Sequence, residues 1–157
     1  MNGYLMQEQK WTPGEDLFIE SFASEGRYGV VFEDDGEAAY FYAVEKDESG
    51  GGLSILDALH IYEGKEGADP QGAGDSAAPA GNSSATDSGS AAAPAKPLLI
   101  IWARDWMKCA LVIDGYCHAI FDFEAHGGYN INEFPPPNDI WTRGDRKLTD
   151  ELIHRLF

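Results

Sequence analysis

Apolar and polar residues alternate with a period of two along most of the chain, and this pattern predicts β-strands. The alternating runs occupy residues 16–22, 27–34, 37–45, 59–63, 98–104, 109–114 and 118–124. Turn-forming residues separate most of these runs, so neighbouring strands are expected to pair as antiparallel hairpins. The pattern predicts an α+β domain built mainly on an antiparallel sheet of about six to seven strands.

Two segments have the features of helices instead. Residues 54–58 predict a short helical turn, with Ser54 as N-cap and Asp57 three residues later. Residues 147–157 predict a C-terminal helix that begins after Thr149. The apolar residues of this helix are expected to share one face, namely Leu148, Leu152, Ile153, Leu156 and Phe157.

A segment of low complexity interrupts the pattern at residues 64–97. It is rich in Ala, Gly, Ser and Pro and contains no aromatic residue, so it cannot bury enough apolar surface to order itself and is predicted to be disordered. If the strands at residues 59–63 and 98–104 pair, the segment is an overgrown hairpin loop. Residues 1–157 then form a single domain with an insertion at a loop tip. A second long loop is expected at residues 126–141, because three consecutive prolines exclude helix and central strand.

Four acidic residues crowd the middle of the run VVFEDDGEAAYFYAVE, residues 30–45. Asp35 and Gly36 between two aromatic, β-branched runs predict a type I′ hairpin turn. This register places Asp34 opposite Glu37, where like charges repel, and a bulged or longer turn that separates them is the alternative. A calcium loop is not predicted, because the run lacks oxygen ligands at alternate positions and a distant bidentate glutamate.

The chain carries 27 acidic residues against 11 Lys and Arg, which gives a formal net charge of −16 over 157 residues. Such a charge repels nucleic acid phosphates and anionic lipids and attracts basic proteins. The sequence has no apolar run long enough to span a membrane and no signal-peptide pattern at its start. Cys109 and Cys117 are expected to be reduced thiols, which together with these features favours a cytoplasmic location.

Two functions fit these features. The first is a non-catalytic protein that binds a basic protein partner, for example an immunity-type protein that neutralises a toxin. It needs no cofactor and no metal, and the residues expected to contact the partner are Glu33, Asp34, Asp35, Glu37, Tyr40 and Tyr42. The competing interpretation is that the acidic charge serves solubility alone.

The second function is a metal-dependent hydrolase. In a continuous strand over residues 118–126, two imidazoles and two carboxylates would share one face, namely His118, Asp122, Glu124 and His126. These groups can bind zinc or act as a general acid and base. The alternative is an ordinary polar outer face opposite Phe121 and Phe123. Because the chain has no recognisable nucleophile motif, the sequence favours a protein that is not an enzyme.

Three long segments carry a resemblance to a known family. They are YGVVFEDDGEAAYFYAVE, ILDALHIY and LVIDGYCHAIFDFEAHGGYNINEFPPP. In this order they resemble an uncharacterised bacterial family, domain of unknown function 2251. The resemblance implies a compact bacterial domain, and it supplies no activity, catalytic residue or cofactor. The long Ala- and Gly-rich insert departs from the family pattern, in which this loop is short.

Overall fold

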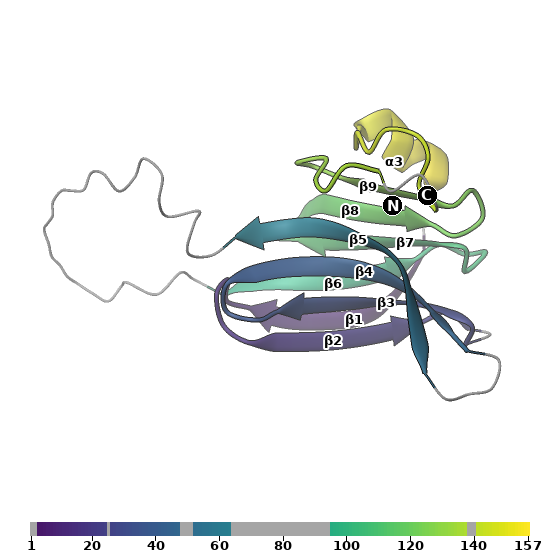
Figure 1. Cartoon of the computed structure of the whole chain (residues 1–157). Coiled ribbons are helices and arrows are strands. Elements are labelled where there is room, and N and C mark those ends of the chain that lie inside the picture. Colours follow the sequence, from purple (N-terminus) through teal and green to yellow (C-terminus); the bar gives the residue numbers. More distant parts are fainter. Residues whose placement is uncertain (1–2, 25, 48–51, 64–94, 138–140) are drawn as a thin grey trace, which may run out of the picture.

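The computed structural model describes residues 3–24, 26–47, 52–63, 95–137 and 141–157. These residues form a series of strands followed by one C-terminal helix (Figure 1). The elements are β1 (Tyr4–Trp11), β2 (Leu17–Phe22), β3 (Tyr28–Asp34), β4 (Ala38–Lys46), β5 (Leu53–Glu63), β6 (Lys96–Trp102), β7 (Lys108–Ile113), β8 (Tyr116–Asp122), β9 (Gly127–Asn130) and α3 (Asp150–Leu156).

The strands form two antiparallel sheets that pack on each other. One sheet has the order β1-β6-β7-β8-β9 and the other has the order β2-β3-β4-β5. The buried core takes Val30 and Phe41 from the smaller sheet and Ile100 and Phe121 from the larger sheet. The rings of Phe41 and Phe121 stack between the sheets with centroids 5.3 Å apart. The predicted α+β class with a mainly antiparallel core is confirmed, and the structure divides its strands between two layers.

The N-terminal strand ties the two halves of the sequence together. β1 pairs with β6 and not with β2, which follows it in the chain, and its register joins Tyr4 to Trp102. The larger sheet therefore contains strands from both sides of residues 64–97, and both sheets share one core. The chain forms a single domain.

Two strands were not predicted. β1 is exposed along most of its length and so lacks the one-sided alternation that marks a half-buried strand. β9 begins with Gly127 and Gly128, which are depleted in strands. A side chain at Gly128 would lie 2.8 Å from the Phe121 ring and 2.9 Å from Asp57 Oδ2. The crowding explains why glycine occupies a strand position here.

The predicted helical turn at residues 54–58 is wrong, because these residues belong to the long strand β5. Ser54 lies opposite Glu45 and Asp57 opposite Ala43 in the ladder with β4. The capping pattern of Ser54 and Asp57 is a local signal worth about 1 kcal/mol, and pairing along a neighbouring strand outweighs it.

The strands on either side of the insert do not pair with each other. β5 belongs to the smaller sheet and pairs with β4, whereas β6 pairs with β1 and β7 in the larger sheet. The expected overgrown hairpin is therefore wrong, and residues 64–95 connect two sheets. Lys96 and Pro97, at the end of the predicted insert, belong to β6. Most of the segment predicted to be disordered, residues 64–94, lies outside the described residues.

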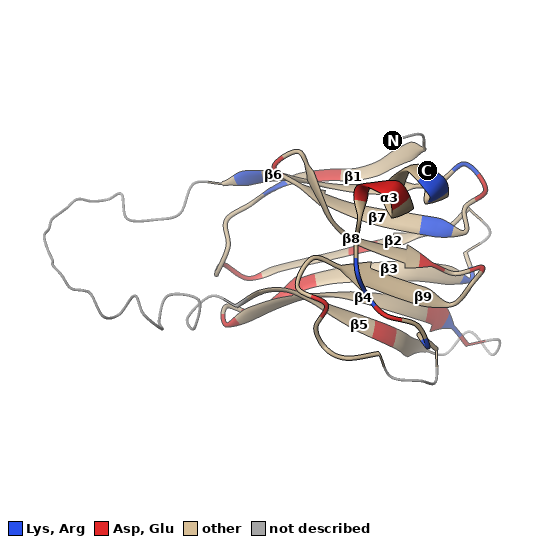
Figure 2. Cartoon of the chain, turned by 90° about the horizontal axis from the view of Figure 1, so that it is seen from above, with Lys and Arg blue, Asp and Glu red and all other residues tan. Residues whose placement is uncertain are grey.

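The C-terminal helix forms as predicted. Thr149 has extended backbone angles, and its hydroxyl accepts a hydrogen bond from the backbone N–H of Leu152. The first turn is acidic and the last turn is basic, as the helix dipole favours (Figure 2). Leu152 is buried, while the other apolar residues of the predicted face are partly buried. α3 and β9 lie at one side of the molecule, and β1 and β2 lie at the other (Figure 1).

Candidate functional site

The acidic hairpin predicted from sequence exists between β3 and β4. Asp35 N–H donates to the carbonyl of Ala38 over 3.2 Å, which leaves Gly36 and Glu37 at the centre of the turn. Gly36 has φ +96°, and a positive φ at the first central position is the requirement of a type II′ turn. The turn centre is thus one residue later than predicted, and Asp34 lies opposite Ala39 instead of Glu37.

Asp34 does not face solvent. It is 2% exposed, and its carboxylate accepts hydrogen bonds from Trp11 Nε1 at 2.9 Å, Gly14 N at 2.8 Å and Gly36 N at 2.9 Å. These bonds join the end of β1, the loop after it and the hairpin turn. The interpretation of Asp34 as a partner contact is therefore replaced by a structural role.

Asp35 lies at the surface of the same turn. Its carboxylate accepts hydrogen bonds from the backbone N–H groups of Glu37 and Ala38 at 2.9 and 3.0 Å. The N–H of Ala38, followed by that of Glu37, lowers the pKa of Asp35. Asp35 consequently carries its charge at neutral pH at the tip of the hairpin, beside the exposed Glu37.

The remaining predicted contact residues lie on the outer face of the smaller sheet. The ladder register places Phe18 beside Glu33, Glu33 beside Tyr40, and Tyr40 beside His60. These four residues form a row across all four strands, which we call the outer row. Most of the residues next to them along the strands are buried in the core, for example Phe41.

Aromatic rings contact each other on this face. Tyr40 and Tyr42 stack with centroids 6.0 Å apart, and Tyr40 meets the His60 ring edge to face at 5.3 Å. Burial raises the pKa of the Tyr42 phenol, and the negative charge of Glu33 raises it further. The aromatic surface therefore lies in a negative field.

A shallow hollow of about 340 Å³ adjoins the outer row. Acidic and apolar residues line it together: Asp16, Leu17, Phe18, Glu33, Asp34 and Asp35. Phe18 is 59% exposed. A cationic side chain entering this hollow meets a carboxylate and an aromatic ring at once, which is the environment that arginine prefers.

The predicted hydrolase face does not form as a continuous strand. β8 ends at Asp122, and its carboxylate accepts hydrogen bonds from Glu124 N and Ala125 N, both at 3.0 Å, to form a turn. Glu124 binds Lys108 Nζ at 3.0 Å. His126 has φ +61° and is the last residue of this turn.

The two histidines of that face line separate cavities. His126 lies with Tyr129, Trp141 and Arg143 around a cavity of about 280 Å³, and its ring stacks on Trp141 at 5.3 Å. His118 lines another cavity, of about 250 Å³, together with His60 and Asn132. Within the described ranges, no group of three or more His, Cys, Asp or Glu side chains is arranged to hold a metal ion.

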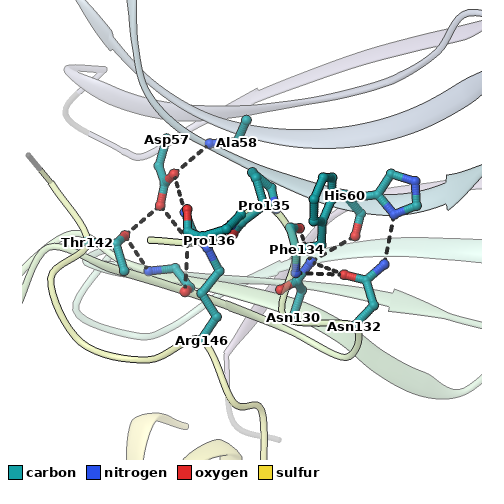
Figure 3. A network of polar contacts seen from close by, with 11 residues as sticks. Asp57, Ala58, His60, Asn130, Asn132, Phe134, Pro135, Pro136, Thr142 and Arg146 are labelled. Atoms are coloured by element: carbon teal, nitrogen blue, oxygen red, sulfur yellow. Dashed lines mark hydrogen bonds and ion pairs between the residues drawn. The ribbon is translucent and has the colours of Figure 1, made fainter. Parts of the chain in front are cut away.

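The sequence did not reveal the buried polar network that joins the C-terminal segment to β5 (Figure 3). Arg146 NH1 and NH2 donate to the two carboxylate oxygens of Asp57 at 2.8 and 2.9 Å, and both side chains are almost completely buried. Thr142 Oγ1 donates to Asp57 Oδ2 and accepts from Gly128 N. A sequence signal for this network was Asp57. It lies two positions before the buried Leu59, so in a strand both side chains point to the inward face.

A second part of this network surrounds Asn130, which has no exposed surface. Its amide nitrogen lies 2.8 Å from the carbonyl oxygen of His60 and 2.9 Å from that of Phe134. Asn132 Nδ2 lies 2.7 Å from His60 Nδ1. Because Asn132 Oδ1 accepts from Phe134 N, its amide nitrogen must face His60, and the loop after β9 is fixed against the edge of β5.

Both cysteines are free thiols, as expected, and they lie on the neighbouring strands β7 and β8. Cys109 is buried and lies opposite Phe121, whereas Cys117 lies opposite Val112. Burial raises the pKa of Cys109 well above its usual value, and burial raises that of Cys117 to about 12. Neither thiol has the low pKa of a reactive cysteine.

These features define a sandwich of two antiparallel sheets with an acidic, aromatic outer face. Within the part of the chain that the structure describes, no helix is long and apolar enough to cross a membrane.

The chain belongs to a family of uncharacterised proteins conserved in bacteria, domain of unknown function 2251, whose model matches residues 11–76 and 85–157. The resemblance in the sequence is thereby confirmed, and only residues 77–84 interrupt the match. An uncharacterised protein of Haemophilus influenzae is 35% identical over 118 residues, which cover 74% of this chain and 58% of that protein. The chain thus spans 58% of the length of this curated relative. No solved structure matches the chain.

Proposed function

We propose that this protein is a non-catalytic, cytoplasmic bacterial protein that binds a basic protein partner through the outer face of β2, β3, β4 and β5. An immunity-type protein that blocks a basic toxin is one form of this function. The proposal rests mainly on one observation, which is that the outer row, with exposed Phe18 and partly exposed Tyr40, lies next to a hollow lined with carboxylates.

The aromatic residues supply what charge alone lacks. Exposed charges are screened by salt and contribute little to affinity, whereas buried aromatic side chains dominate the binding energy of many interfaces. Tyr40 and Tyr42 are already stacked in the free protein. They therefore lose little conformational freedom when a partner covers them.

The acidic residues steer the partner and select its charge. The chain has a net charge of −16, which raises the association rate of cationic proteins at low salt. Glu33 lies within the outer row, and Asp35 and Glu37 lie at the adjoining hairpin tip. If the acidity served solubility alone, the position of these carboxylates beside the aromatic row would have no effect on any association.

The test distinguishes the effect of the carboxylates beside the outer row on association from the effect of the overall net charge. The partner is isolated by pull-down from the native host, and its association is measured at several salt concentrations. The double variant Glu33→Gln/Asp35→Asn keeps Asp34 and its three hydrogen bonds. The control Glu8→Gln/Asp114→Asn removes the same charge from exposed positions of the larger sheet.

We expect the first pair to slow association several-fold at low salt and the control pair to have a much smaller effect. The partner should have a high isoelectric point, and its association should slow steeply with salt. Equal effects of the two pairs would locate the interface elsewhere. Failure to recover any basic partner would leave the acidity as a solubility feature.

A further inference from the structure

The outer row continues beyond the sheet onto the loop after β9. The ring of Phe134 meets the His60 ring edge to face, with centroids 5.9 Å apart. His60 in turn contacts Tyr40 within the row. Phe134 is 51% exposed, so it extends the aromatic surface past β5, the edge strand of the smaller sheet.

The backbone under this exposed ring is held firmly (Figure 3). The carbonyl of Phe134 accepts hydrogen bonds from His60 N and from Asn130 Nδ2, both at 2.9 Å, and its own N–H donates to Asn132 Oδ1 at 3.0 Å. Buried Arg146 donates to the carbonyls of Pro135 and Pro136. The buried side chains of Asn130 and Arg146, together with the exposed Asn132, thus fix a loop that presents an apolar ring to solvent.

We propose that Phe134 is the apolar anchor of the partner interface, an inference that rests on the proposed function. A ring on a fixed backbone can be covered with little loss of conformational entropy, which is the property of a binding hot spot.

The geometry also defines the partner segment. Neighbouring strands lie about 4.8 Å apart, so the path from Phe18 to His60 is about 14 Å. The 5.9 Å step to Phe134 brings the total to about 20 Å. An extended chain covers this distance in about six residues at about 3.3 Å per residue. The partner therefore places a basic side chain at the acidic hollow and an apolar side chain on Phe134, about six positions away.

A displayed library of random nonapeptides, selected on the full chain, tests this arrangement without knowledge of the partner. Selection is repeated on Phe134→Ala and on the control Tyr116→Ala, which removes a 71% exposed ring from β8 in the other sheet. Because the hydrogen bonds of residue 134 use backbone atoms, Phe134→Ala should melt within a few degrees of the unchanged protein. Phe134→Leu is a second variant that keeps an apolar side chain.

On the unchanged protein we expect enrichment of Arg or Lys together with an apolar residue five to seven positions away. On Phe134→Ala the apolar preference should vanish while the basic preference stays. A resynthesised consensus peptide should bind Phe134→Ala about tenfold more weakly, and Phe134→Leu should recover part of this loss.

An apolar preference that persists in Phe134→Ala, or that is lost equally in Tyr116→Ala, would overturn the anchor role alone. Peptides enriched in Arg or Lys but in no apolar residue would also overturn the anchor role. In each of these cases the proposed function would stand. If the peptides selected on the unchanged protein show no enrichment of Arg or Lys, this result would count against the proposed function itself.

Discussion

Asp34 and Asp35 are neighbours in the chain, but they have opposite environments. Asp34 is 2% exposed and accepts three hydrogen bonds from groups in different elements. Asp35 lies in solvent and accepts hydrogen bonds only within its own turn. At this scale a residue's environment follows from the groups around it, so two identical side chains in succession differ in burial and in hydrogen-bond partners.

Replacement of Asp34 by Ala should destabilise the protein by about 3 kcal/mol, because it leaves the N–H groups of Trp11, Gly14 and Gly36 without their acceptor. Chemical denaturation measures the loss. Asp35→Asn is the matched control and should change stability little, because the amide oxygen can still accept. Similar losses in both variants would contradict the structural role of Asp34.

Cys117 should react slowly in the folded protein. Burial raises the pKa of its thiol to about 12 from the usual 9.0, so few molecules carry the reactive thiolate at pH 8. Even after allowance for the greater nucleophilicity of a high-pKa thiolate, we expect alkylation at least about 30-fold slower than in denaturant. Mass spectrometry of time points measures the rate.

The pH dependence of stability at this site has a definite sign. The folded protein favours the neutral thiol, so this stabilisation is complete below pH 9 and is lost as the pH rises toward 12. Cys117→Ser should flatten the fall in stability over that range. Fast labelling of native protein at pH 8 would contradict the buried thiol.

At the scale of elements, the C-terminal segment is attached to β5 through a buried ion pair. Asp57 and Arg146 have side chains only 3% and 1% exposed and are separated by 2.8 Å. A buried ion pair stabilises a protein little more than two apolar side chains in the same positions would. Removal of one partner, however, leaves the other charge buried and uncompensated. The attachment therefore depends on both residues together.

Arg146→Met and Asp57→Asn should each destabilise the protein by about 3–5 kcal/mol. The double variant should lose less stability than the sum of the two single losses, because neither buried charge then remains unpaired. Denaturant titration of the four proteins gives the coupling energy. Additive losses would show that the pair acts as two independent groups.

Glycine at position 128 is required by the contact between β9 and β5. An added Cβ there would lie 2.9 Å from Asp57 Oδ2 and 2.8 Å from the Phe121 ring, whereas one at Gly144 would meet nothing within 4 Å. Gly128→Ala should lower the melting temperature by several degrees, and Gly144→Ala should leave it nearly unchanged. Differential scanning calorimetry compares the two variants, and equal melting temperatures would contradict the close packing around Gly128.

At the scale of the whole molecule, β1 makes the two halves of the chain interdependent. It is contributed by the N-terminal half and pairs with β6 of the C-terminal half. The core likewise contains residues from both halves. Each half alone would expose one face of its sheet to water.

Fragments 1–63 and 95–157 should therefore be unfolded when separate and should form one folded complex when mixed. Separate fragments of about 60 residues with half a core are near the lower limit of stability. Circular dichroism and NMR spectra of each fragment and of the mixture measure the outcome. Cooperative unfolding of either fragment alone would contradict the shared core.

The sequence by itself determined the local elements. The β3–β4 hairpin and the helix after Thr149 form in the predicted segments, although the hairpin turn is centred one residue later than predicted. At the β7–β8 turn both central residues have positive φ, 54° and 84°, as an Asp-Gly type I′ turn requires. These elements depend on residues within a few positions of each other, so their signals are present in short stretches of sequence. The acidic and aromatic residues of the candidate site come from the same short stretch of sequence, but the burial of Asp34 within it was not predicted.

Only the tertiary structure decided how these elements combine. The pairing of Tyr4 with Trp102 and the ion pair of Asp57 with Arg146 join residues far apart in the chain, and no local pattern specifies such partners. The same long-range packing converted residues 54–58 from a capped turn into strand, buried Asp34 while it left Asp35 exposed, and placed Phe134 beside the outer row. Period and turn chemistry fix which residues can form a strand, whereas the free energy of closing a common core fixes which strand lies next to which.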